Sequence, residues 1–210
     1  RFGNLNLKTF VTQFRDNLDK DPNRPGYTDR QAGLTFEHQI SSWPYVGYTT
    51  TYSQGTRDIS SNYTGDGAYE GRVETVSSMF TFASDQVNAT AFAELANGGD
   101  AVGERTMVTY YLGGSYYPTS IFSITPDMTF VDEAYLDQSA RTRSMYSSLS
   151  FALTPRRSKF TYTLFGQYDT SVNRAWYMDS SYYYTGVGIE RRHNETKPNS
   201  ARWSVQLGYD

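Results

Sequence analysis

Residues 202–209 alternate between polar or small side chains and apolar ones. The segment is Arg202-Trp203-Ser204-Val205-Gln206-Leu207-Gly208-Tyr209. Because successive side chains of a β-strand point to opposite faces, this alternation predicts a strand with one apolar and one polar face. A helix would repeat its apolar residues every third or fourth position, and no such stripe is sustained in the chain. The expected fold class is all-β.

The same period of two recurs along the whole chain. Residues 144–153 alternate in this way, and residues 87–95 do so except at Phe92, an aromatic residue in the polar register. Such segments predict about eleven strands of roughly ten residues each. The expected strands cover 5–15, 31–40, 45–55, 69–83, 87–95, 105–115, 121–131, 143–153, 159–169, 181–191 and 202–210.

Composition narrows the class of protein. The chain has 210 residues, 38% of them hydrophobic, with a net charge of -3 and a mean hydropathy of -0.63. These values disfavour a helical membrane protein and a basic nucleic-acid binder. The 19 Tyr, 12 Phe and 3 Trp exceed what a disordered chain contains. With no cysteine, neither a disulfide nor a thiolate metal site is expected.

The connections between the expected strands tend to alternate in length. Short ones fall at 41–44, 84–86, 117–119 and 154–157, and longer ones at 16–30, 56–68, 96–104, 132–142 and 170–180. Residues 193–200 form a further connection on the short side that is longer than its neighbours. Short turns at one end and long loops at the other are typical of bacterial transmembrane β-barrels.

The strand, turn and aromatic pattern of the whole chain resembles the Gram-negative outer-membrane β-barrel superfamily. The sharpest local match is residues 205–210, Val-Gln-Leu-Gly-Tyr-Asp, which resemble the terminal strand that the barrel-insertion machinery reads. That signal normally ends on an aromatic residue, whereas this segment ends on Asp210. The resemblance implies an antiparallel up-and-down transmembrane barrel in the bacterial outer membrane, either porin-like or exporting exopolysaccharide.

The expected domain organisation is one barrel domain over residues 1–210, incomplete at the C-terminus if the barrel is larger. Bacterial single-chain barrels close with an even number of strands. An odd count of eleven therefore predicts either about 12 strands or an excerpt of a larger barrel.

One polar face is expected to line a lumen. Its mixed charges would bind and pass a hydrophilic solute or a polysaccharide, or would pair across strands in a plugged interior. The expected lumen-lining residues are Lys8, Glu37, Gln39, Glu70, Arg72, Glu74, Glu94, Lys159, Gln167, Arg191, Arg202 and Gln206.

Aromatic residues near the expected strand ends are interpreted as a girdle at the lipid headgroups. A sugar-stacking track is the alternative, and it would have to face the lumen rather than lipid. The residues concerned are Trp43, Tyr110, Tyr111, Tyr116, Tyr117, Trp176, Tyr182, Tyr183, Tyr184 and Trp203.

Catalysis is not expected, because the only two histidines, His38 and His193, lie far apart in sequence without identifiable partners. Neither a cofactor nor a metal is expected. The expected partners are outer-membrane lipid, a hydrophilic solute or polysaccharide, the insertion machinery and possible partner subunits, with no nucleic acid. Two other functions stay open: a soluble secreted β-sandwich that binds carbohydrate, and a structural or adhesive barrel acting through its loops.

Overall fold

The computed structural model describes residues 3–15, 27–59, 69–100, 103–135, 140–156, 160–173, 178–191 and 204–209. Eleven β-strands make up almost all of these residues. The strands are β1 (Asn4–Arg15), β2 (Tyr27–Ser42), β3 (Tyr45–Ile59), β4 (Tyr69–Ala83), β5 (Val87–Asp100), β6 (Gly103–Thr119), β7 (Phe122–Tyr135), β8 (Ala140–Leu153), β9 (Phe160–Asn173), β10 (Met178–Arg191) and β11 (Ser204–Tyr209). The all-β prediction is confirmed.

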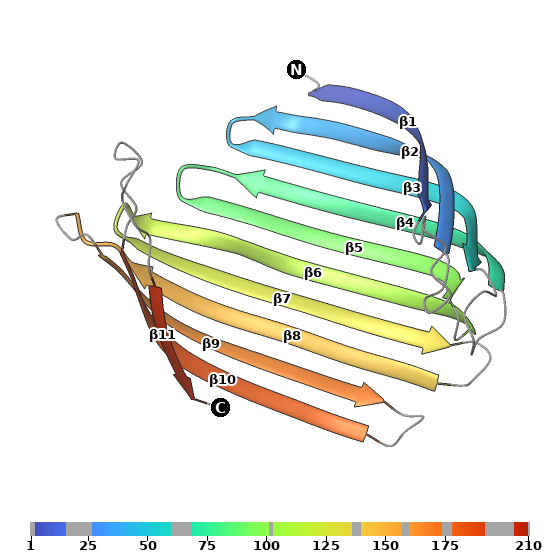
Figure 1. The fold of residues 1–210 in the computed structure, drawn as a ribbon. Helices are drawn as coiled ribbons and strands as arrows, with labels where there is room; N and C mark the ends of the chain where they lie inside the picture. The colour runs from blue at the N-terminus through green and yellow to red at the C-terminus, as the bar shows by residue number, and fades with distance from the viewer. Residues whose placement is uncertain are drawn as a thin grey trace.

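The strands form one antiparallel up-and-down sheet in which each strand pairs with its neighbours in sequence (Figure 1). The ladders β2–β3 and β6–β7 each contain an irregularity, between Gln39 and Ser41 and between Tyr116 and Thr119. The sheet is not closed: β1 and β11 form its two edges. The described residues contain no helix that is long and apolar enough to cross a membrane.

All eleven expected strands are present, and β4 has the expected bounds, Tyr69–Ala83. The expected segregation of short and long connections is wrong in part. Three connections that were expected to be long are short. Only residues 101–102 separate β5 from β6, only 136–139 separate β7 from β8, and only 174–177 separate β9 from β10. The strands run past their expected ends because polar residues continue the ladder, as where Gly98 pairs with Arg105. Residues 192–203, on the opposite side, form a longer connection than any of these three.

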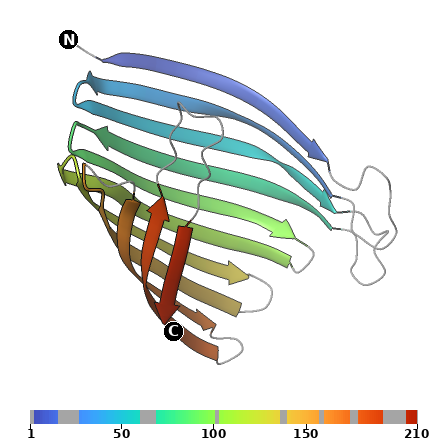
Figure 2. The ribbon, with the colours of Figure 1, turned by 60° about the vertical axis from the view of Figure 1, so that its left-hand side comes forward.

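The sheet is a single curved layer, and its β9–β11 end is inclined steeply to β1–β6 (Figure 2). The pairing register assigns the side chains to two faces, which we call the concave and the convex face. Eight described residues are buried, and all lie on the concave face, where curvature crowds the side chains. They are Gly47, Ser53, Gly71, Val73, Gly113, Ala140, Gly186 and Gly188.

Candidate functional site

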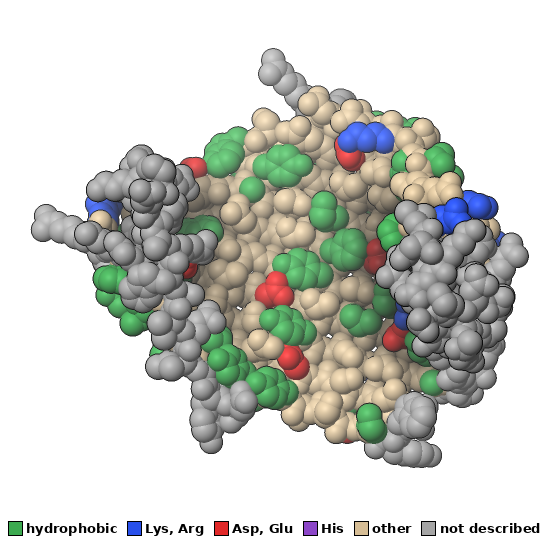
Figure 3. Space-filling view, in the orientation of Figure 1, with side chains coloured by type: hydrophobic (Ala, Val, Ile, Leu, Met, Phe, Trp, Pro, Cys, Tyr) green, Lys and Arg blue, Asp and Glu red, His purple; other side chains and the backbone are tan. Residues whose placement is uncertain are grey.

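The concave face consists mainly of backbone and uncharged polar side chains, among which stand isolated acidic and hydrophobic side chains (Figure 3). The rows across the strands contain hydroxyl pairs, such as Thr35 with Thr51 at 3.1 Å and Ser144 with Ser171 at 3.2 Å. Short hydroxyl side chains leave the hollow open and offer both donors and acceptors. The surface can therefore hydrogen bond to a polar solute along most of its width.

The concave face carries an excess of negative charge. Its described side chains include seven acids and two bases, Lys8 and Arg105. Both bases are paired: Lys8 Nζ lies 2.7 Å from Glu37 Oε1, and Arg105 binds Glu133. The described side chains of this face therefore carry a formal net charge of -5, and five of the acids lie outside these two pairs. They are Asp29, Glu94, Asp127, Asp169 and Glu190.

An aromatic row crosses the middle of the concave face. The register aligns Phe92 with Tyr111 across β5 and β6. On the other side of Thr129, it aligns Tyr146 with Asp169 and Asp169 with Tyr182. The sequence signal for this row is an aromatic residue in a polar register: Phe92 interrupts an alternating strand, and Tyr146 occurs among serines. Sequence reasoning did not include Phe92, Tyr146 or Asp169 in the candidate site.

Tyr111 is held over a glycine at the centre of this face. A Cβ atom added at Gly113 would lie 2.1 Å from the Tyr111 hydroxyl oxygen and 2.9 Å from Asp127 Oδ2. The Tyr111 hydroxyl donates a hydrogen bond to Asp127, which is directly opposite Gly113 in the ladder. The absence of a side chain at Gly113 therefore leaves room for the Tyr111 side chain to extend over this position and to reach the carboxylate.

We expect Gly113→Ala to displace the Tyr111 ring and to lower the free energy of unfolding by about 1 to 3 kcal/mol, because the added methyl group overpacks the contact. Gly166→Ala is the matched control, since its Cβ would meet only Thr185 Cγ2, at 3.9 Å. Urea unfolding of the protein folded in detergent or vesicles measures both variants. Equal losses of stability in the two variants would contradict the account of Tyr111.

The convex face is apolar over a continuous belt. Of the 29 exposed large hydrophobic side chains among the described residues, 20 lie on this face. We define the apolar band as the convex residues of the segments 87–95, 108–116, 122–130, 145–153 and 160–168 on β5 to β9, with their neighbours on the other strands. Each segment is nine residues long. The band includes Leu112, Leu149 and Leu164, with exposed fractions of 54%, 41% and 54%.

Among the described side chains, charged residues occupy the convex face only at one end, beside the connections 16–26, 60–68, 101–102, 136–139 and 174–177. We call these residues the charged rim. The rim is Arg15, Arg30, Arg72, Glu74, Glu104, Asp132, Arg141, Arg143 and Asp179. Unlike the concave face, the rim has nearly balanced charges.

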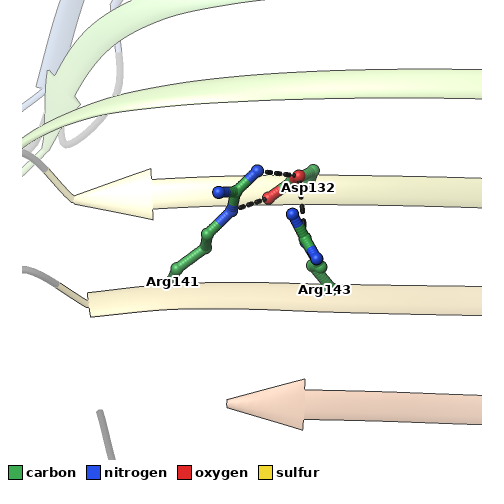
Figure 4. Close-up of polar contacts among 3 residues, drawn as sticks. All are labelled: Asp132, Arg141 and Arg143. Carbon is green, nitrogen blue, oxygen red and sulfur yellow. Dashed lines mark hydrogen bonds and ion pairs between the residues drawn. The ribbon is translucent and has the colours of Figure 1, made fainter. Parts of the chain in front are cut away.

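Within the charged rim, Asp132 on β7 binds two arginines of β8 (Figure 4). Arg141 Nε donates to Asp132 Oδ1 at 2.7 Å, and its Nη2 donates to Oδ2. Arg143 Nε donates to the same Oδ2 at 3.2 Å. The cluster has a net positive charge directly beyond the apolar band.

The expected lumen-lining residues do not share one face. Lys8, Glu37, Gln39, Glu94 and Gln167 lie on the concave face. Arg72 and Glu74 instead lie on the convex face within the charged rim. They precede Val76 and Phe80 on the same face of β4, because polarity there changes along the strand as well as between faces. The side chains of Glu70, Arg191 and Gln206 lie outside the described part, as do the residues Lys159 and Arg202.

The expected aromatic girdle also divides between the faces. Tyr110, Tyr116 and Tyr183 are convex, whereas Tyr111, Tyr182 and Tyr184 are concave. The expectation that these residues mark strand ends is wrong for Tyr110 and Tyr111, which lie in the middle of the long strand β6. Two further residues are exposed, Trp43 in the turn between β2 and β3 and Tyr117 near the irregular end of β6. Trp176 and Trp203 are outside the described residues.

His38 lies on the convex face, in register with Leu5 and Tyr48, and its ring meets Phe36 edge-on at a centroid distance of 6.5 Å. His193 lies outside the described residues. No group of three or more His, Asp or Glu side chains in the described ranges is arranged to hold a metal ion.

No protein-family model, curated protein or solved structure matches this chain. The distribution of side chains over the two faces therefore carries the functional inference.

Proposed function

We propose that this sheet is part of the wall of an outer-membrane β-barrel whose concave face lines a channel for a hydrophilic solute or a polysaccharide. The observation that carries the proposal is the polarity of this single curved sheet, which is the reverse of that expected for a sheet around a hydrophobic core. Its outward face holds the apolar side chains and its inward face the polar and acidic ones. In a transmembrane barrel the outward face meets lipid and the inward face meets water.

The dimensions of the apolar band support this proposal. A transmembrane strand tilted by about 45° needs roughly 9–11 residues to cross the hydrocarbon core. The band segments, such as Met145–Leu153, contain nine residues. The charged rim begins directly beyond them, where lipid headgroups and water replace hydrocarbon.

Shallow apolar grooves in the convex face also suit contact with acyl chains. One groove of 450 Å³ passes over Gly166 and is lined by Leu149, Phe151 and Leu164, among others. A second, of 340 Å³, passes over Gly114 beside Leu112 and Met128. Both grooves are open surface depressions that a flexible hydrocarbon chain can fill.

A soluble β-sandwich is less well supported. Two packed sheets bury their apolar faces against each other, whereas the described residues form one layer whose apolar face is uncovered. The edge strands β1 and β11 also support the barrel proposal, because each has one side without a strand partner among the described residues and exposed edges invite pairing with further strands. We propose that additional strands close the barrel.

The test is to express the chain with a signal peptide in a Gram-negative host and to follow where it folds. We expect it in detergent-extracted outer membranes, with a gel mobility that changes on heating. The control is a known soluble β-sandwich protein carrying the same signal peptide. If the chain accumulates as a folded β-protein in the soluble fraction, the membrane proposal is wrong and the tyrosine-rich surface should be screened for carbohydrate binding.

A further inference from the structure

We propose that a concave pocket around Asp169 binds an organic ammonium cation. This inference deepens the proposed function by naming the class of solute that the concave face recognises. It rests on that function in one respect: the solute must be able to reach the concave face. The argument depends on three residues from neighbouring strands: Tyr146 of β8, Asp169 of β9 and Tyr182 of β10.

The register places a carboxylate between two aromatic rings. Asp169 is aligned directly with Tyr146 on one side and with Tyr182 on the other. The two tyrosines remain accessible, with exposed fractions of 39% and 44%. Because all three side chains project from the same face of adjacent strands, they border one pocket rather than three separate sites.

The pocket has a volume of 470 Å³ and a lining of hydroxyl and aromatic groups. Besides the three central residues, Thr129, Ser144, Ser171 and Ser180 contribute from the concave face. Its volume falls in the range of sites that hold small organic ligands, roughly 300 to 1,000 Å³. No Lys, Arg or His side chain is among the described lining residues.

The carboxylate of Asp169 is only partly satisfied by the protein. Gln167 Nε2 donates to Asp169 Oδ2 at 2.9 Å. The other oxygen, Oδ1, is buried and has no hydrogen-bond partner among the described residues. Leaving a charged acceptor without a hydrogen bond costs more than an ordinary hydrogen bond contributes, so a cation that neutralises the Asp169 carboxylate gains from this site.

The ligand that matches these groups is positively charged. An ammonium group can neutralise the charge of Asp169 by electrostatic attraction, and aromatic ring faces attract cations, above all quaternary ammonium groups. The two described bases of the concave face cannot supply this charge, because Lys8 and Arg105 are already paired with Glu37 and Glu133. An anionic ligand would be repelled, and a neutral sugar would leave the carboxylate charge uncompensated.

The aromatic surface continues from the pocket along β10. The rings of Tyr182 and Tyr184 are stacked at 9° with centroids 6.5 Å apart. Tyr184 in turn meets Phe165 at 5.4 Å. An organic cation with a carbon skeleton therefore has apolar surface to cover beside the site of its charge, which favours it over a bare metal ion.

The test measures binding to the full chain folded in detergent micelles, so that it does not depend on membrane location or conductance. The probes are choline chloride and its uncharged isostere 3,3-dimethyl-1-butanol, followed by isothermal titration calorimetry. We expect saturable binding of choline, at least tenfold weaker binding of the isostere, and at least tenfold weaker choline binding in Asp169→Asn. Tyr182→Leu should weaken choline binding severalfold.

The matched control is Asp179→Asn, which removes the same charge from the convex face of the adjacent strand and should leave binding unchanged. Comparing the two probes on the unaltered protein keeps the test decisive even if Asp169→Asn folds poorly. Equal affinity for both probes, no binding of choline, or binding of glucose in place of choline would overturn the proposal. Those outcomes leave membrane insertion to its own test, so the two proposals can fail separately.

Discussion

Leu149→Arg is expected to destabilise the membrane-inserted protein by about 2 to 4 kcal/mol, the cost of an arginine facing lipid near the bilayer midplane of a barrel. Leu149 is the central residue of the band segment Met145–Leu153 and has an exposed fraction of 41%. In the proposed placement its side chain contacts hydrocarbon, which cannot solvate a guanidinium group. The measurement is the urea dependence of folding into lipid vesicles.

Ser148→Arg is the matched control for this prediction. Ser148 is adjacent in β8 but faces the concave side, in register with Asp127 and Gln167. An arginine there reaches the polar hollow and an acidic neighbour, so we expect a loss of stability well below that of Leu149→Arg. If the two variants lose stability equally, or if Ser148→Arg is the worse of the two, the assignment of the convex face to lipid is wrong.

Charge reversal at Glu94 and Asp127 is expected to reduce the preference for cations severalfold in the reconstituted protein. Both side chains lie on the concave face. The double variant Glu94→Lys, Asp127→Lys changes the formal net charge of the described side chains on that face from -5 to -1. Rings of like charge inside a pore set which ions enter. The measurement is the reversal potential of planar bilayers in a potassium chloride gradient.

The control places the same charge change on the other face. Glu104 and Asp179 belong to the charged rim on the convex side. We expect Glu104→Lys with Asp179→Lys to leave the reversal potential nearly unchanged, since these residues are outside the proposed lumen. Equal shifts in both double variants would show that net charge rather than position governs selectivity, and a complete absence of conductance would contradict the channel.

Periodicity predicted the strands well because each one is amphipathic over a long stretch. The alternation of residues 144–153 is reproduced in the structure, with Leu149 convex and Ser148 concave. Phe92 breaks the alternation of its segment. The structure explains this exception, because Phe92 belongs to the concave aromatic row with Tyr111.

Face assignment was harder to predict from polarity alone. Arg72 and Glu74 are polar, yet they share the convex face with Val76 and Phe80. A strand that passes out of an apolar band becomes polar on both faces, so residue type no longer indicates direction. Consecutive tyrosines such as Tyr110 and Tyr111 necessarily face opposite ways, and only the register of neighbouring strands identifies which of them is concave.

The strands are longer than the nine-residue segments of the apolar band, so at one end they extend beyond it as a polar extension of the sheet. On β8, residues 140–144 precede the band and carry Arg141 and Arg143. Five residues at about 3.4 Å each and a tilt of roughly 45° raise this end of the strand about 12 Å above the hydrocarbon layer. In the proposed membrane placement a solute therefore meets a wall of hydrogen-bonded strands before it reaches the depth of the hydrocarbon layer.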